Sequence, residues 1–492
     1  MTVLSNSTLS EITSLETPHY DRATLRAGIA HFGVGNFVRT HLAVYVHELL
    51  QVGGSQDWGI AGIGLSDGEA ARAKAATFAR QDCLYSLTEF DPDGTSTSRV
   101  IGSVIDYLHA PSDPAAVLNL LADPGLRIVS LTITEGGYFV DPETGQFDAD
   151  ASEVDRDAEN PLPATVFGFI VQALRRRRDA GLPGLTVMSC DNLPHNGQVA
   201  KRAVLGFARA IDPDLCAWIE AEVTFPNSMV DRVAPYVSSE QRARLNAATG
   251  LDDELPVPTE SYLQWVLEDH FAAGRPDFAR VGVEYTEDVG PWENAKLRVL
   301  NASHVLTSYP SVLLGHRVIN QAMNDPAVLR LADTFLTQDA IPLVQAPEGL
   351  DLFAYKDSVL ARFGNRAIED QVLRVATDGA QKLAVFLSTT VRELLARGGD
   401  TRRVALAFAC YQGYLQGLDE RGERFEVTEP HLSALDRETI AAADGLGLLR
   451  IPAFADLKLL DSPSFVTDFL QSSQTLRISG VEAGIDQAVA ER

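Results

Sequence analysis

The hydrophobic pattern of the first half of the chain alternates between two periods. Short apolar runs of strand length are separated by amphipathic stretches of helical period. The predicted strands are Gly28–Phe32, Trp58–Gly64, Leu84–Phe90, Arg127–Thr134 and Leu185–Cys190. The predicted helices between them are Phe37–Leu50, Gly68–Ala79, Pro114–Leu121, Thr165–Asp179 and Asn196–Ile211. This alternation is typical of an open α/β sheet built by right-handed crossovers.

The pattern changes near residue 290. A last β-like run covers Val281–Gly290, and from about Pro291 onward strand patterns largely vanish. Long helical periods follow, including Ala367–Arg397 and Thr401–Leu418. The sequence therefore predicts an α/β domain over residues 1–290 and a mostly α-helical domain over residues 291–492.

Composition limits the class of protein and its partners. The 492 residues have a formal net charge of −26, which argues against nucleic acid or an anionic membrane as a partner. The N-terminus does not resemble a secretory signal, and no apolar stretch reaches transmembrane length. Four cysteines without close spacing indicate neither a zinc cluster nor a disulfide framework. We therefore expect a cytoplasmic protein with reduced thiols.

A glycine turn follows the first predicted strand. Gly33 and Gly35 occupy the first two positions of the dinucleotide-binding fingerprint, whereas the third glycine is replaced by valine. Because the turn lies between a strand and a helix, its backbone is placed to approach a pyrophosphate. The candidate cofactor residues are Gly33, Val34, Gly35, Asn36 and Phe37. The alternative is an ordinary glycine turn.

Two acidic residues follow the second predicted strand. Asp67 and Glu69 come directly after it, where a carboxylate can accept hydrogen bonds from the adenosine ribose and repel a 2′-phosphate. This arrangement favours NAD over NADP, with Glu69 as the preferred ligand. The alternative is that both acids cap the next helix.

The segment Pro291–Pro310 is predicted to be one helix, because proline fits its first turn and marks its end. At about 100° per residue, His304 lies about 80°, Asn301 about 140° and Glu293 about 60° around the axis from Lys296. One side of the helix would then present a base, an amide donor and two further titratable groups. Such a set can oxidise an alcohol, since a lysine of lowered pKa takes the hydroxyl proton and amides hold the alkoxide. The alternative is a solvated helix face.

Six segments together resemble the polyol-specific long-chain dehydrogenases, the mannitol dehydrogenase family. They are AHFGVGNFVRTH, SLTITEGGYFVD, TVMSCDNLPHNG, FPNSMVDRVAP, QWVLEDHFAAGRP and KLRVLNASH. The resemblance implies a Rossmann-like dinucleotide-binding domain followed by a mostly helical catalytic domain. It also implies an NAD-dependent enzyme that needs no metal and converts D-mannitol to D-fructose, with D-arabinitol or D-glucitol as further substrates.

The resemblance implies roles for individual side chains. Lys296 would be the general base, Asn192 and Asn301 the donors to the alkoxide, and His304 the residue that orients substrate hydroxyls. Glu293 corresponds to an acid near the proton exit path.

The outer part of the implied substrate pocket is less well matched. The matching positions are Val230, Asp231, Arg374 and Lys382. An ordinary ion pair between Asp231 and Arg374 is the alternative. Asn36 replaces a glycine common in the family, and the segment DGAQKLAVF departs from the family's DGSSK close to Arg374.

Two other functions remain open. A hexuronate reductase acting on fructuronate or tagaturonate shares the scaffold, but its carboxylated substrate should need a further cation in the pocket. An NAD-binding regulator without turnover is a different class, against which the intact set Lys296, Asn301 and His304 argues. We expect a small-molecule polyol or ketose as partner and a monomeric state.

Overall fold

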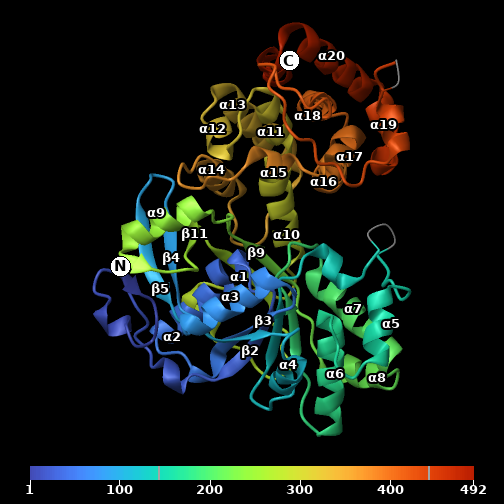
Figure 1. Cartoon of the computed structure of the whole chain (residues 1–492). Helices are drawn as coiled ribbons and strands as arrows, with labels where there is room; N and C mark the ends of the chain where they lie inside the picture. The colour runs from blue at the N-terminus through green and yellow to red at the C-terminus, as the bar shows by residue number, and fades with distance from the viewer. Residues whose placement is uncertain (142–144, 442–443, 492) are drawn as a thin grey trace. The chain divides into compact units, whose positions relative to one another are not determined.

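The computed structural model describes residues 1–141, 145–441 and 444–491. It divides into two compact units (Figure 1). Unit 1 comprises Met1–Asp91 and Thr95–Gly290, and unit 2 comprises Pro291–Arg492 with Pro92–Gly94.

Unit 1 is built on a sheet of five parallel strands in the order β6-β3-β2-β7-β8. These are β2 (Ala27–Phe32), β3 (Gly59–Gly64), β6 (Val104–His109), β7 (Ile128–Leu131) and β8 (Thr186–Ser189). Counted within this sheet, the strand order is 3-2-1-4-5, the order of dinucleotide-binding sheets. Such sheets bind their ligand beyond the carboxyl ends of the strands where the order reverses, here between β2 and β7.

Alternate side chains of the central strands enter two different cores. In β2, Ala30 and Phe32 belong to one core and Ile29 to the other. In β7, Val129 and Leu131 face the first core. Because both faces are covered, the strands consist of near-continuous apolar runs, which is why they were recognisable in the sequence.

Helices supply the remaining walls of these cores. Those of unit 1 are α1 (Asn36–Thr40), α2 (Leu42–Gln51), α3 (Glu69–Arg80), α4 (Pro114–Leu121), α5 (Ser152–Glu159), α6 (Val166–Asp179), α7 (Asn196–Ile211), α8 (Leu215–Glu222) and α9 (Ser239–Thr249). The predicted helix Phe37–Leu50 is wrong as one element, because it breaks at His41 (φ −122°, ψ −90°). The His41 ring bonds the carbonyl of Gln264 at 3.0 Å, a tertiary contact that overrides the local helical period.

Two of the sheet assignments also need correction. The predicted strand Leu84–Phe90 exists as β4 (Tyr85–Phe90), but it pairs with β5 (Ser96–Ile101) and β11 (Val257–Glu260) in a separate sheet. The edge strand β6 was missed, because several of its side chains are partly exposed and its apolar pattern is weak. A third sheet joins β9 (Ser228–Asp231), β12 (Gln264–Glu268) and β13 (Glu284–Thr286), and β1 (Thr2–Val3) pairs with β10 (Leu251–Asp252).

The described part of unit 2 contains helices and no β-strand longer than an isolated bridge. Its α-helices are α10 (Gly290–Lys296), α11 (Ala302–Leu313), α12 (Ile319–Met323), α13 (Pro326–Thr334), α14 (Leu352–Phe363), α15 (Val372–Ala376), α16 (Gly379–Phe386), α17 (Ser388–Arg397), α18 (Arg402–Tyr414), α19 (Ala434–Ile440), α20 (Pro463–Ser479) and α21 (Val481–Val489). The long helical period Ala367–Arg397 is therefore three helices, interrupted by Asp378 in the left-handed region (φ 57°) and by Leu387. Among the described residues no helix is long and apolar enough to cross a bilayer.

Candidate active site

The glycine turn after β2 has the conformation that its two glycines allow. Gly33 has φ +92°, and a Cβ there would lie 2.0 Å from the carbonyl oxygen of Thr132. At Gly35, the N-cap of α1, a Cβ would have only the carbonyl oxygen of Gly33 within 4 Å, at 3.9 Å. Gly33 thus permits the turn, and Gly35 leaves its outer side open to an approaching phosphate.

The neighbouring side chains hold this turn in place. Val34 is buried. The amide of Asn36 donates to the carbonyl of Pro235 at 2.7 Å and accepts from Arg39, and Phe37 stacks on His41 at 4.9 Å. Of the five candidate cofactor residues, these three support the turn through their side chains.

The two acids after β3 differ in what they bind. Asp67 forms an ion pair with Arg72 at 2.8 Å and accepts the backbone N–H of Gly68. Glu69 opens α3 and is exposed, and among the described residues its carboxylate has no hydrogen bond or ion pair. The helix-cap alternative therefore describes Asp67 better, and Glu69 keeps its carboxylate available for a ribose.

Asn192 follows β8, next to a buried carboxylate that sequence reasoning missed. Asp191 accepts the backbone N–H groups of Ile133 at 3.0 Å and Thr134 at 2.9 Å, and the hydroxyl of Tyr138 at 2.6 Å. Thr134 has φ 64° and ψ 165°, a conformation that residues other than glycine rarely adopt. Asp191 thus ties the loop after β7 to the loop after β8. Its position directly before Asn192 at a strand end was the signal available in the sequence.

Val230 and Asp231 are buried at the end of β9, where Asp231 is in register with Gln264 of β12. The next residue, Arg232, is anchored in the interior of unit 1. Its guanidinium donates to the carbonyl of Thr40 at 2.6 Å and forms an ion pair with Glu89.

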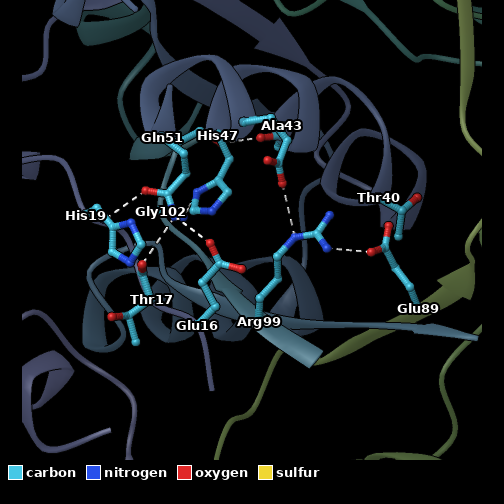
Figure 2. Close-up of polar contacts among 12 residues, drawn as sticks. Glu16, Thr17, His19, Thr40, Ala43, His47, Gln51, Glu89, Arg99 and Gly102 are labelled. Carbon is cyan, nitrogen blue, oxygen red and sulfur yellow. Dashed lines mark hydrogen bonds and ion pairs between the residues drawn. The ribbon is translucent and has the colours of Figure 1, made fainter. Parts of the chain in front are cut away.

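This anchor extends through a second arginine. Figure 2 shows Arg99 of β5 reaching the carboxylate of Glu89, at 2.5 Å, and Arg99 also pairs with Glu48 of α2 at 3.3 Å. These linked ion pairs therefore hold the strand that bears Asp231 against the helices that follow the glycine turn.

The helix that bears Lys296 is not a regular α-helix. Its turn Leu297–Asn301 is π-helical, between α10 and α11, and α11 continues through Pro310 to Leu313. The prediction that the helix stops at Pro310 was therefore wrong, and so was the angular estimate that assumed a regular helix.

The π-helical turn changes which side chains share a face. A bond pattern of i→i+5 places roughly 80° between successive residues instead of 100°. On that basis Asn301 would lie about 40° and His304 about 20° from Lys296, closer than an α-helix would place them. All three are partly buried, as is Glu293 in the first turn of α10.

Arg298 fixes the opposite side of the π-helical turn. It is buried and donates to both carboxylate oxygens of Glu393 in α17, each at 3.2 Å, and to the hydroxyl of Thr390 at 3.1 Å. It also donates to the carbonyl of Leu343. These bonds set the rotation of the helix about its axis, and with it the direction of the Lys296 face.

His304 is neutral at physiological pH. Burial lowers its pKa to about 4, with Arg374 and Lys382 also disfavouring the protonated form and Asp370 favouring it. Its ring stacks on Phe363 at 4.5 Å, and among the described residues its Nε2 has no hydrogen-bond partner. A neutral imidazole with one nitrogen unused can exchange a hydrogen bond with a hydroxyl group.

The two candidate cations near His304 have partners of their own. Arg374 forms an ion pair with Asp370, with contacts of 2.6 Å and 2.7 Å. Lys382 of α16 donates to the carbonyls of Val375 at 2.9 Å and Arg374 at 3.3 Å. Both therefore have a structural role around the short helix α15. No group of three or more metal-ligating side chains was found in the described ranges.

Two family models cover most of the chain. Residues 27–280 match the mannitol dehydrogenase Rossmann domain, and residues 288–477 match the mannitol dehydrogenase C-terminal domain. The chain therefore belongs to the mannitol dehydrogenase family. The family resemblance and the fold class expected from the sequence are confirmed.

Relatives extend over nearly the full length of the chain. A polyol:NADP oxidoreductase of Gluconobacter oxydans is 46% identical, with 98% of this chain and 100% of that protein covered. The crystal structure of a substrate-free D-sorbitol dehydrogenase superposes with a TM-score of 0.93 at 46% identity, covering 98% and 100% of the two chains. The ternary complex of Pseudomonas fluorescens mannitol 2-dehydrogenase with NAD and D-mannitol has a TM-score of 0.88 at 39% identity, covering 99% and 100%.

Proposed function

We propose that this chain is an NAD-dependent polyol dehydrogenase that oxidises D-mannitol to D-fructose, and D-arabinitol or D-glucitol as further substrates. The class of enzyme and its cofactor agree with the sequence prediction, since the family is that of mannitol dehydrogenases and the P. fluorescens relative was solved with NAD and D-mannitol. The observation that supports the catalytic assignment best is the π-helical turn Leu297–Asn301. In idealised geometry such a turn would bring Lys296, Asn301 and His304 to one side of their helix.

The chemistry assigns one task to each side chain. Lys296 removes the proton of the substrate hydroxyl, and Glu293 receives protons from it on the way to solvent. Asn192 and Asn301 donate N–H groups to the oxygen on which negative charge develops. His304, neutral, binds a further substrate hydroxyl, and Val230 and Asp231 border the same substrate. A metal is not needed in this scheme, because the two amides do the work of a Lewis acid.

The glycine turn and Glu69 fit the cofactor. When bound, NAD accepts the hydride from the carbinol carbon of the substrate. The backbone of residues 33–37 would hold its pyrophosphate, and the carboxylate of Glu69 would accept from its ribose hydroxyls. Glu69 favours NAD over NADP, although the Gluconobacter relative is named for NADP. The two cofactors therefore need to be compared directly.

The state of the cations supports a polyol over a hexuronate. Arg374 is neutralised by Asp370, and Lys382 is engaged by two backbone carbonyls. A carboxylated substrate would have to compete for these groups. An NAD-binding regulator that catalyses no reaction would have no use for a general base, so the presence of Lys296 together with Asn301 and His304 argues against that class. The cytoplasmic location and the monomeric state stay predictions.

The lysine assignment is tested with Lys296→Ala. We expect NADH binding, followed by fluorescence, to be retained, while kcat for mannitol oxidation falls by orders of magnitude, because the general base is lost. Lys458→Met is the matched control, since Lys458 is exposed in the same unit, and it should keep normal turnover. Near wild-type turnover in Lys296→Ala would contradict the assignment.

The substrate and cofactor are tested with a panel. Mannitol, arabinitol and glucitol are assayed with NAD⁺ or NADP⁺, and fructose and fructuronate with NADH, in buffer containing a chelator. We expect activity on polyols and fructose, a higher kcat/KM with NAD⁺, and no loss to the chelator. Activity on fructuronate alone would replace this proposal with the hexuronate reductase.

A further inference from the structure

Two cations converge on the glycine turn, and neither was among the candidate cofactor residues. Lys74, from α3, donates to the carbonyl of Val34 at 2.5 Å. Arg39, from α1, donates to the carbonyl of Gly35 at 3.3 Å and to the side-chain oxygen of Asn36 at 2.7 Å. Both positive charges thus lie against the three-residue turn Gly33–Gly35 itself.

Neither cation has a carboxylate partner within ion-pair distance in the described part of the chain. Other buried arginines are of both kinds, since Arg232, Arg298 and Arg403 form ion pairs, whereas Arg177 donates only to backbone carbonyls. Arg39 is only 5% exposed, and Lys74 is half-buried. Holding two like charges close together and away from water costs free energy unless an anion compensates them.

The electrostatics of Lys74 agree with a missing counter-charge. Burial and, to a smaller extent, the positive charge of Arg39 together lower the pKa of Lys74 to about 8. An ammonium group has three donors, and the Val34 carbonyl uses one of them. Among the described residues the two remaining donors have no acceptor, so they can bind an anion beside the turn.

We propose that Lys74, supported by Arg39, is the cationic part of the dinucleotide site and neutralises the pyrophosphate that the glycine turn holds. The inference rests on the proposed function, because it takes the dinucleotide as given, and it assigns the charge contribution to a residue outside the turn. In this arrangement Glu69 discriminates at the ribose, whereas Lys74 supplies affinity for the phosphates of NAD and NADP alike. A hydrogen bond from an ammonium group to a phosphate oxygen is charge-assisted, so its loss should weaken dinucleotide binding measurably.

The competing explanation is structural: the Lys74–Val34 bond could serve only to tie α3 to the turn. Three variants of Lys74 separate these roles. Lys74→Met removes both the charge and the hydrogen bond, whereas Lys74→Gln removes the charge and keeps an N–H donor. Lys74→Arg keeps the charge. Lys201→Met is the matched control, because Lys201 is exposed on α7 of the same unit.

The measurement is the Kd of NADH and of NADPH, from fluorescence titration of the whole protein without substrate. We expect Lys74→Met and Lys74→Gln to raise both values about tenfold or more, which corresponds to roughly 1.4 kcal/mol or more. Lys74→Arg should recover most of the affinity, and Lys201→Met should bind normally. Added salt should weaken cofactor binding less in the two neutral variants than in the wild type. They lack the attraction between the Lys74 ammonium and the phosphates, which salt screens.

Several results would overturn the inference. Wild-type affinity in Lys74→Gln would show that the ammonium charge is not used. Loss of NADPH binding alone would assign Lys74 to the 2′-phosphate instead of the pyrophosphate. If Lys74→Met does not fold, the Kd values of Lys74→Gln and Lys74→Arg still show whether the positive charge at this position contributes to binding. Wild-type protein that does not bind NADH at all would instead contradict the proposed function, so the two failures are distinguishable.

Discussion

Asn192 and Asn301 are the residues whose proposed role can be measured most directly. Each is replaced by alanine, and we expect kcat for mannitol oxidation to fall about 10²–10³-fold, because one N–H donor to the alkoxide is lost. Steady-state kinetics with saturating NAD⁺ measures the change. Asn324→Ala, an exposed amide of unit 2, should leave kcat unchanged. A loss confined to KM would mean that the amides bind the ground state and not the alkoxide.

At the residue scale, burial alone does not distinguish a structural histidine from a histidine of the candidate site. His31 is buried and bonds the hydroxyl of Thr132 at 2.9 Å, and burial lowers its pKa to about 3. His31 leaves only its Nδ1 without a partner, whereas His304, likewise neutral, has no ring hydrogen bond among the described residues. The sequence could not separate these two cases, because the difference lies in the partners and not in the residue type.

At the scale of elements, the π-helical turn depends on Arg298. Replacing Arg298 by methionine keeps the side-chain length and leaves Glu393, Thr390 and a backbone carbonyl without their donor. We expect the free energy of unfolding to fall by about 1–3 kcal/mol, because the buried Thr390 hydroxyl and the partly buried Glu393 carboxylate lose a charged donor. Urea denaturation measures this. The variant should also lose kcat with little change in NADH binding, since the Lys296 face loses its orientation.

The control for Arg298→Met is Arg330→Met. Arg330 pairs with Asp486 on the surface, with both side chains about half-exposed, so its loss should cost less than about 1 kcal/mol. Equal destabilisation by the two substitutions, or full activity of Arg298→Met, would show that the Arg298 bonds do not orient the helix.

In the loops after β7 and β8, neighbouring residues have different roles. Asn192 is proposed to contact substrate, whereas Asp191 holds the loop in which Thr134 adopts a strained backbone conformation. Burial raises the pKa of Asp191, while its hydrogen bonds with Tyr138, Ile133 and Thr134 favour the charged form. Strain of this kind persists only where surrounding contacts enforce it.

At the scale of the whole molecule, buried histidines make stability depend on pH. Burial lowers the pKa of His47 to about 3, and its Nδ1 accepts from the Tyr20 hydroxyl at 2.8 Å. In the unfolded chain the pKa is about 6.5. Between these values the unfolded state binds the additional proton, so stability is fully present above about pH 6.5 and is lost as the pH falls.

His47→Gln tests this linkage. The difference in unfolding free energy between wild type and variant should shrink by about 2 kcal/mol from pH 7 to pH 5, because only the wild type loses stability through His47. Urea denaturation at both pH values measures it, with His270→Gln as control, since His270 is exposed in the same unit. A difference that stays constant with pH would mean that His47 has the same pKa in the folded and unfolded states, which would contradict the prediction.

The sequence by itself determined the features that depend on local spacing. Alternating apolar periods identified the strands of the parallel sheet other than β6, and Gly33 and Gly35 identified the turn, because a positive φ and an open backbone require glycine. The motif segments identified the family. These signals survive folding because each depends on residues close together in the chain.

Only the tertiary structure decided which partner each side chain has. A hydrogen bond to a carbonyl 223 residues away accompanies the break of the helix at His41. Lys74 meets the glycine turn 40 residues away. The π-helical turn follows the same rule, since Arg298 bonds to residues 92 and 95 positions away. Such contacts leave no periodic trace in the sequence, because their free energy depends on which surfaces folding brings together.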